Sequence, residues 1–430
     1  MYSFFETLKN IWKIEELKNR IFITLFFLAI YRLGAQVVLP GIDSVQLAEL
    51  SSRTQGGGLL GILNAFTGGA FANASVFALG IMPYISASIV VQLMGIAVPY
   101  LQKLQKEGES GRKTINQITR WLTILICVVQ APAYLYSLGA LGVPETAFIL
   151  GKTPVFVFSS VVILVTGCVF AMWLGEKITD KGIGNGISLL ITVGIIASLP
   201  QAFFQEFTSR VTQSNGGAIT ILIELVIWIV VIALCVLLVK AVRQVPVQYA
   251  RRTASGGFDK NQASSRQYIP LRLNASGVMP IIFAQAIMFA PAYVGQLFGD
   301  SSFGQWLQTS FSDMFGLWYN ILFGFLIIVF TYFYTAITVP TNKMSDDLKR
   351  SGGFVPGIRP GGETSEFLDK IMSLITFPGS LFLAAVSVLP AIIVQIMGMQ
   401  QGWALFYGGT SLLIMVGVAI DTIQQINAYL

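Results

Sequence analysis

Ten apolar stretches, each long enough to cross a lipid bilayer, divide this chain of 430 residues. A transmembrane helix needs about 20 predominantly apolar residues, and each stretch meets that requirement within its usual range. The ten predicted spans are residues 21–39, 76–98, 121–141, 154–174, 186–204, 218–239, 273–293, 317–339, 371–397 and 403–420. The sequence therefore predicts an all-α polytopic membrane protein.

The basic residues predict how this protein is oriented. When the gaps between spans are assigned alternately to two sides, 23 of the 27 Lys and Arg residues fall on the side of the amino-terminus. The positive-inside rule places that side in the cytoplasm, so both termini are predicted to be cytoplasmic. Residues 1–20 mix apolar and charged side chains, and we expect an amphipathic interfacial helix there, before an uncleaved first span.

The composition excludes several functions. The chain has no histidine, which rules out both a zinc HExxH site and a serine–histidine dyad, and it has no phosphate-binding loop of the GxxxxGK[ST] type. The glycines of the sequence GIGNG, residues 182–186, resemble a phosphate cradle only weakly, because no strand precedes them. We therefore expect neither an enzyme nor a cofactor, and a partner must hydrolyse any nucleotide. The net charge of +6 follows the cytoplasmic gaps, where insertion bias explains it without nucleic acid.

Charges inside the predicted spans bear on ion-coupled transport. Glu224 lies in the outer part of the sixth span, Asp421 at the inner end of the tenth, and Arg32 towards the outer part of the first. A charge at the bilayer centre costs at least about 2.5 kcal/mol and usually marks a function. None of the three is central, so terminal snorkelling or one structural ion pair explains them better than a proton or sodium relay.

Two kinds of gap depart from simple loops. The outer gap from Pro40 to Ser75 contains an apolar segment that is too short to span, and it either lies on the membrane surface or re-enters the membrane beside a cavity. The cytoplasmic gaps 240–272 and 340–370 are long and project into the cytosol. In the second gap, glycines and prolines bracket Arg359, which favours a tight turn that presents one guanidinium, either for docking or to solvent.

Seven sequence segments, in order and from the first span to the last, resemble the SecY family of Sec protein translocon channels. These are YRLGAQVVLPGID, LLGILNAFTGGAFANASVFALGIMPYISASIVVQL, KEGESGRK, WLGEKITDKGIGNGIS, VPVQYARR, SGGFVPGIRPGG and GGTSLLIMVGVAIDT. The resemblance covers essentially the whole chain. It implies two inverted five-span halves, 21–204 and 205–430, that close like a clamshell around a pore.

The same resemblance assigns residues to the channel. It implies an apolar pore ring of Ile81, Ile85, Ile187, Ile191, Ile282 and Ile414. It implies a re-entrant plug over residues 59–74 that includes Leu59, Leu60, Ile62, Leu63, Asn64, Phe66 and Phe71. The second and third spans face the seventh and eighth across a lateral gate, which Ser86, Gln92 and Gln285 are positioned to tune. Ordinary packing and ordinary interhelical hydrogen bonds remain alternatives at single positions.

The resemblance also implies the partners. Arg251, Arg252 and Arg359 match loop positions that engage the SecA ATPase or the ribosome in the family, and SecE and SecG are expected as further subunits. Substrates are then signal peptides and unfolded secretory or membrane proteins, which pass through the bacterial cytoplasmic membrane or leave sideways into its lipid. A secondary transporter with inverted repeats, and less readily a structural membrane scaffold, are the competing hypotheses.

Overall fold

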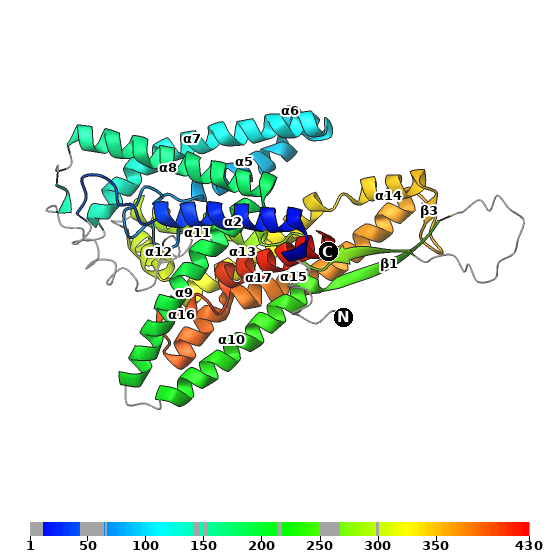
Figure 1. The fold of residues 1–430 in the computed structure, drawn as a ribbon. Coiled ribbons are helices and arrows are strands. Elements are labelled where there is room, and N and C mark those ends of the chain that lie inside the picture. The colour runs from blue at the N-terminus through cyan, green and yellow to red at the C-terminus, as the bar shows by residue number, and fades with distance from the viewer. Residues whose placement is uncertain are drawn as a thin grey trace, which may run out of the picture.

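The structure is a computed structural model that describes residues 12–43, 64, 67–140, 147–149, 151, 153–212, 217–249, 267–297 and 301–429. Long helices dominate it (Figure 1). Each predicted span overlaps one long helix. These helices are α2 (Glu15–Gly34), α5 (Met82–Ala97), α7 (Glu109–Ala140), α8 (Pro154–Lys181), α9 (Gly186–Thr212), α10 (Gly217–Lys240), α11 (Met279–Leu297), α13 (Leu317–Thr338), α15 (Gly362–Met397) and α17 (Gly409–Tyr429). The helical fold class is therefore confirmed.

Not all of these helices qualify as membrane spans by length and hydropathy alone. Within the described residues, seven helices are long and apolar enough to cross a membrane, and eight if α5 and α6 (Pro99–Lys106), which meet at a bend of 100°, count as one broken span. Helix α2 misses the test because it contains Lys18 and Arg20 near its start and Arg32 near its end. The count of ten spans stays a prediction.

Several helix boundaries differ from the predicted spans. Helix α9 continues to Thr212, so the expected division between halves at 204/205 falls inside a helix. Helix α17 begins only at Gly409, because that glycine has a φ of +64° and the short helix α16 (Gln401–Ala404) precedes it. Helix α2 begins at Glu15 and runs without a break through the expected boundary at residue 20 between the interfacial helix and the first span.

The two gaps predicted to be cytoplasmic, 240–272 and 340–370, contain a small sheet that the all-α prediction missed. Strand β1 (Val242–Tyr249) lies between β2 (Gln267–Arg272) and β3 (Gly353–Phe354), and it is antiparallel to both. Val245 and Val247 of β1 are buried. They belong to an apolar cluster with residues of α14 (Thr341–Arg350) and α15, so the two gaps form one folded unit.

Packing repeats between the first five long helices and the last five. In the first set, α2 packs against α8 and α9, α5 against α7, α7 against α8, and α8 against α9. In the second set, α10 packs against α15 and α17, α11 against α13, α13 against α15, and α15 against α17. These contacts correspond one for one along the chain. The two sets touch mainly through α9, which contacts α10, α16 and α17 (Figure 1).

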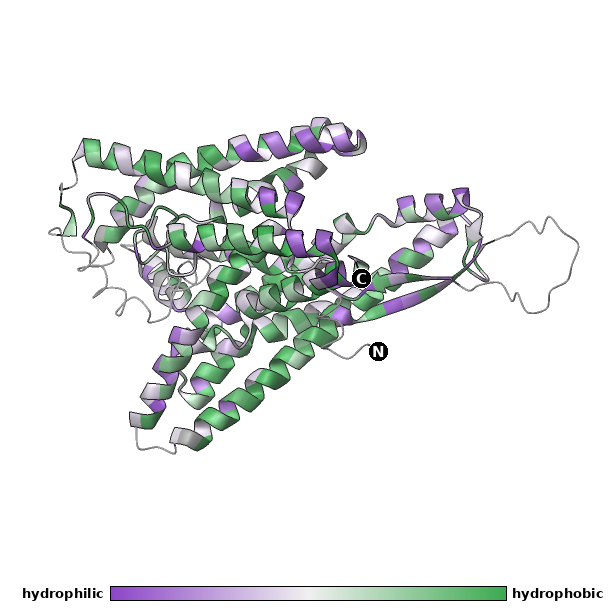
Figure 2. Ribbon diagram, viewed as in Figure 1, coloured by the Kyte–Doolittle hydropathy of each residue, from purple (hydrophilic) through white to green (hydrophobic). Residues whose placement is uncertain are grey.

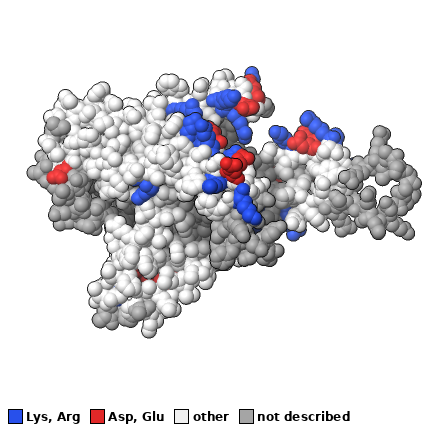
Figure 3. Space-filling model, viewed as in Figure 1, with Lys and Arg blue, Asp and Glu red and all other residues white. Residues whose placement is uncertain are grey.

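Polar residues are concentrated at one end of the molecule. The long helices are largely apolar, whereas hydrophilic residues gather around α6, α14 and β1 (Figure 2). Lys and Arg side chains cluster toward the same end of the visible face (Figure 3). The start of α2 and the end of α17 also meet, since the Arg20 guanidinium lies 5.3 Å from the centre of the Tyr429 ring. This distribution supports the predicted orientation.

Candidate functional site

The six predicted pore-ring isoleucines come together where α9 meets the second set of helices. Ile191 and Ile414 belong to one apolar cluster, and Ile85, Ile187 and Ile282 pack against it. Ile81, at the start of α5, belongs to a neighbouring cluster that shares Ile85 and Ile187. Ile81, Ile191 and Ile414 are only 4%, 7% and 3% exposed. The structure thus forms one continuous apolar zone from these residues, and their role as a pore ring stays a prediction.

In the described part of the predicted plug, Asn64 and residues 67–74, side chains form hydrogen bonds with the backbone of the same segment. The Thr67 hydroxyl donates to the Asn64 carbonyl at 3.2 Å and accepts from the Phe71 N–H at 3.1 Å. The Asn64 side-chain oxygen accepts from the Ala72 N–H at 3.0 Å. The segment is therefore a compact turn. The other predicted plug residues, Leu59, Leu60, Ile62, Leu63 and Phe66, lie outside the described residues.

Two helices hold this segment by its backbone carbonyls. The Arg32 guanidinium of α2 donates to the Gly68 carbonyl at 3.0 Å, and the Tyr134 hydroxyl of α7 donates to the Phe71 carbonyl at 2.7 Å. The Tyr134 ring also packs against the Phe71 ring, with 4.8 Å between ring centres. Ala70 is fully buried. Burial of this kind favours the re-entrant interpretation over a loop on the membrane surface.

The plug segment and the isoleucine zone border a common space. A small cavity is lined by Thr67 of the plug segment, Tyr31 of α2, and Ile81, Met82, Ile85 and Ile191. Thr67 of the predicted plug therefore lies beside three of the predicted ring residues. Their roles as plug and ring stay predictions.

Gln92, a predicted gate residue, forms a hydrogen bond from α5 to α13. The Tyr334 hydroxyl of α13 donates to the Gln92 side-chain oxygen at 3.1 Å, and the Gln92 amide donates to the Ser88 hydroxyl at 3.4 Å. The Tyr334 ring lies 6.0 Å from the ring of Phe283 on α11. Sequence reasoning missed Tyr334, because one tyrosine in the aromatic run TYFYT carries no signal of its own.

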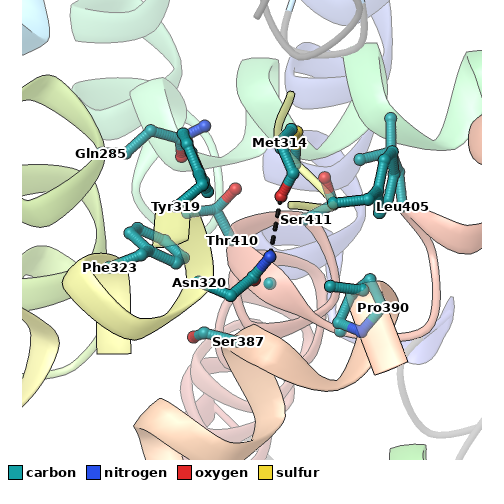
Figure 4. Close-up of a pocket in the computed structure, with 14 residues that line it drawn as sticks. Gln285, Met314, Tyr319, Asn320, Phe323, Ser387, Pro390, Leu405, Thr410 and Ser411 are labelled. Atoms are coloured by element: carbon teal, nitrogen blue, oxygen red, sulfur yellow. Dashed lines mark hydrogen bonds between the residues drawn. The ribbon is translucent and has the colours of Figure 1, made fainter. Parts of the chain in front are cut away.

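The other two predicted gate residues do not take part in this hydrogen bond. Ser86 is half-buried on α5. Gln285 of α11 is buried and lines a cavity within the second set of helices, together with Tyr319, Asn320 and Thr410 (Figure 4). That cavity has a volume of about 30 Å³, enough for only a few water molecules. Gln285 is therefore not placed at the contact between α5 and α13.

Glu224, the acid in the sixth predicted span, belongs to a structural ion cluster. The Arg210 guanidinium of α9 pairs with Glu206 at 2.6 Å and with Glu224 of α10 at 2.9 Å, and it also donates to the Met397 carbonyl at 2.8 Å. Both carboxylates are buried, at 2% and 1% exposure. This buried ion cluster ties α9 to α10 and to the end of α15. Asp421 is exposed on α17. The structural explanation of Glu224 is thus the better one.

The glycine-rich turn between α8 and α9 is packed against other helices. The Ile183 N–H donates to the Thr24 hydroxyl of α2 at 3.0 Å, and the Gly184 N–H donates to the Gln425 side chain of α17 at 2.7 Å. Gly184 adopts a φ of +81°, which glycine tolerates without strain. These amides bind protein groups, so the turn is not arranged as a phosphate cradle.

Arg359 lies on the folded unit formed by the sheet, α14 and the start of α15, which is predicted to be cytoplasmic. Its side chain is 88% exposed, and its guanidinium lies 3.8 Å from the Glu363 carboxylate. Gly357 and Gly361, with φ of +85° and +112°, form the turns on either side. As expected, Arg359 lies in a tight turn with its guanidinium exposed to solvent. Arg251 and Arg252 lie outside the described residues.

Known proteins resemble this chain along most of its length. A model of the SecY family matches residues 75–423. The protein translocase subunit SecY of Streptomyces scabiei is 37% identical over 426 residues, which cover 97% of this chain and 96% of the relative. A solved structure of a protein conducting channel has a TM-score of 0.62 at 16% identity and covers 96% and 92% of the two chains.

A second solved structure, Sec61 in the canine ribosome-channel complex from the endoplasmic reticulum, has a TM-score of 0.58 at 15% identity and covers 96% of this chain and 92% of that one. At these identities the two structures establish the fold, while the family model and the bacterial relative establish descent. This chain belongs to the SecY family.

Proposed function

We propose that this chain is the protein-conducting subunit of a Sec translocon in the bacterial cytoplasmic membrane. It passes unfolded secretory polypeptides across the membrane and releases apolar segments sideways into lipid. Membership of the SecY family supports this function, and the observation that carries it is the isoleucine zone covered by the plug segment. The chain supplies a passive path, and a partner supplies the energy.

The isoleucine zone explains how a pore for unfolded chains stays closed to ions. An apolar constriction dewets, and an ion entering it loses its hydration without gaining new ligands. Aliphatic side chains also shift between rotamers, so they adapt to successive residues of a threading polypeptide. The low exposure of Ile81, Ile191 and Ile414 supports a ring that is closed to water in this state.

The contact between α5 and α13 is suited to a lateral gate. It lies between the second and the eighth predicted span, and the Tyr334–Gln92 hydrogen bond is its polar element. A segment in the pore leaves for lipid when its partition free energy exceeds the cost of opening this contact. Leucine, isoleucine and phenylalanine each favour the membrane by about 0.3–0.6 kcal/mol at the centre of a helix, so several such residues together open the gate.

The repeated packing supports two halves that move against each other. We assign the five helices from α2 to α9 to the first half and the five from α10 to α17 to the second, with the division in residues 213–216. The first half touches the second through α9, and the ion cluster of Arg210 lies at that contact. Opening then separates α5 from α13 and leaves the contact between α9 and α10 as the hinge.

The partners follow from orientation and from exposed charge. Both termini and the unit that carries Arg359 face the cytoplasm in this proposal, where SecA or a translating ribosome drives the polypeptide. The exposed guanidinium of Arg359, and Arg251 and Arg252 in the preceding gap, are the proposed contacts. SecE and SecG complete the complex in the membrane.

A leak measurement tests the proposed pore. Replacing Ile81 and Ile191 together with glycine removes two buried side chains from the constriction, and we expect ion conductance of the resting channel in planar bilayers to rise. The matched control replaces Ile229 and Ile321, which are 61% and 56% exposed, with glycine. Equal conductance in both double variants would refute the assignment. Depletion in cells, followed by accumulation of secreted precursors, tests the export function itself.

A secondary transporter is not supported. Such a protein needs a compact solute site and an acid that couples ions. The cavity near Gln285 holds only a few waters, and Glu224 is paired with Arg210. The comparisons likewise point to translocase subunits.

A further inference from the structure

We propose that Arg32 is the latch of the plug and that the Phe71–Tyr134 contact is its hinge, so that the plug opens by releasing Gly68 while its base stays in place. This proposal rests on the proposed channel function, because it specifies how the covering segment is held. Arg32 and Tyr134 are positioning residues in it, since in the resting channel they hold the plug in place.

Arg32 has an unusual environment for a charge in a predicted span. Charged side chains within spans persist where they face a cavity, a partner or a functional path. Among the described residues Arg32 forms no ion pair, and its guanidinium donates instead to the Gly68 carbonyl at 3.0 Å. The bond joins positions 36 residues apart, so it fixes the plug segment to α2 across the outer gap.

The plug contacts Arg32 through the backbone of Gly68, which has no side chain. Gly68 has a φ of +64°, and a Cβ built on it would lie 2.5 Å from the Arg32 guanidinium and 2.8 Å from the Cα of Gly194 on α9. The side chain of Arg32 can move away, but the backbone of α9 cannot move without shifting the helix. Gly68 therefore fits a notch between α2 and α9 that admits no side chain.

The two ends of the described plug segment are held very differently. At the base, Phe71 and Ala74 belong to an apolar cluster with Tyr134 and Leu135 of α7, and the Tyr134 hydroxyl adds a hydrogen bond. At the Gly68 end, the contacts are the charge-assisted hydrogen bond from Arg32, the backbone packing of Gly68 on α9, and the small buried side chain of Thr67 beside a cavity. The base therefore resists displacement more than the Gly68 end does, and Gly69 lies between them with a φ of +90°.

The hydrogen bond from Arg32 to the plug can be replaced by the same kind of bond to another chain. The acceptor is a backbone carbonyl, and every polypeptide that enters the pore brings carbonyl oxygens of the same kind. Once Gly68 leaves the notch, the Arg32 guanidinium can donate to those carbonyls instead of remaining unpaired. The latch therefore discriminates between an empty and an occupied channel without depending on the sequence that occupies it.

Cysteine labelling tests the latch directly. Thr67 is 2% exposed, so Thr67→Cys, a change close in size, places a protected thiol on the plug. The three native cysteines are buried, and the parent chain without this substitution gives their background. Added to Thr67→Cys, Arg32→Met should raise the labelling rate of the resting complex by a membrane-impermeant maleimide about tenfold, which corresponds to about 1.4 kcal/mol.

Two glycine variants act on the other partner and provide the matched comparison. Gly68→Ala should accelerate labelling as Arg32→Met does, because its Cβ meets α9. Gly69→Ala carries comparable backbone strain, yet its Cβ would meet nothing nearer than 3.8 Å, so it should label close to the parent rate. Unchanged labelling in Arg32→Met, or equal labelling in the two glycine variants, would overturn the latch.

The outcome is separable from that of the channel assignment. If the Ile81/Ile191 double variant leaks but the latch variants label at the parent rate, the latch fails and the channel stands. If the latch variants label faster but the double variant does not leak, the contact is real and the pore ring is wrong. If Arg32→Met does not fold, Gly68→Ala and Gly69→Ala still decide the question.

Discussion

Removing one hydroxyl tests whether the α5–α13 contact is a gate. Tyr334→Phe deletes the donor of the 3.1 Å hydrogen bond to Gln92 and keeps the ring, with its packing against Phe283. The bond exists only while α5 and α13 touch, so its loss destabilises the closed gate. We expect less apolar segments to enter the lipid through this variant than through the parent.

The magnitude of the effect follows from the kind of bond. Neutral hydrogen bonds between membrane helices contribute about 0.6 kcal/mol on average, and about 1.7 kcal/mol at most. One leucine in the middle of a test segment contributes about 0.5 kcal/mol to insertion. In an assay that counts the leucines needed for half-maximal insertion of a model segment, Tyr334→Phe should therefore lower the threshold by about one leucine, and by three at most.

Two controls isolate the contact. Tyr332→Phe removes a hydroxyl from the same helix at a position that is 37% exposed, and its threshold should equal that of the parent. Gln92→Met removes the acceptor, and the double variant with Tyr334→Phe should shift the threshold no further than either single change. Additive shifts, or a threshold that Tyr334→Phe leaves unchanged, would show that the bond does not hold a gate.

Two further predictions, each with a control variant, address the unit that carries Arg359 and the proposed hinge. Arg359→Glu should slow export of a precursor driven by SecA while the protein remains inserted, whereas Arg350→Glu on the nearby α14 should not; equal export rates would remove Arg359 from the docking surface. Arg210→Met leaves Glu206 and Glu224 buried without a counter-charge and should destabilise the protein by about 3–5 kcal/mol in denaturant unfolding. Glu224→Gln leaves one carboxylate for one guanidinium and should cost clearly less, and the reverse order would contradict the cluster.

The helices were predictable from hydropathy, but their ends were not. An apolar run marks only the part of a helix that lies in lipid, and α15 begins at Gly362, well before the predicted ninth span at 371. The sheet was missed for a related reason. Strand β1 buries only Val245 and Val247 on one face, a pattern too short to be distinguished from a loop until β2 and β3 are seen to pair with it.

The polar contacts of the site were the least predictable part. Nothing in the sequence indicates that Arg32 binds the carbonyl of Gly68, 36 residues away, because every residue has a carbonyl. Glu224 and Arg210 belong to neighbouring helices, and their pairing depends on how α9 and α10 pack. The ring isoleucines came from family resemblance alone, since any isoleucine in a span also suits lipid or ordinary packing.

The relative strength of these contacts bears on how the proposed channel opens. The Tyr334–Gln92 bond is neutral and is worth about 0.6 kcal/mol. Separating α9 from α10 would take Glu224 away from Arg210, which stays paired with Glu206 on α9, and would leave the Glu224 carboxylate buried without its counter-charge at a cost of about 3–5 kcal/mol. In the proposed mechanism an entering polypeptide therefore separates α5 from α13 before it separates α9 from α10, and opening is confined to the side of the proposed gate.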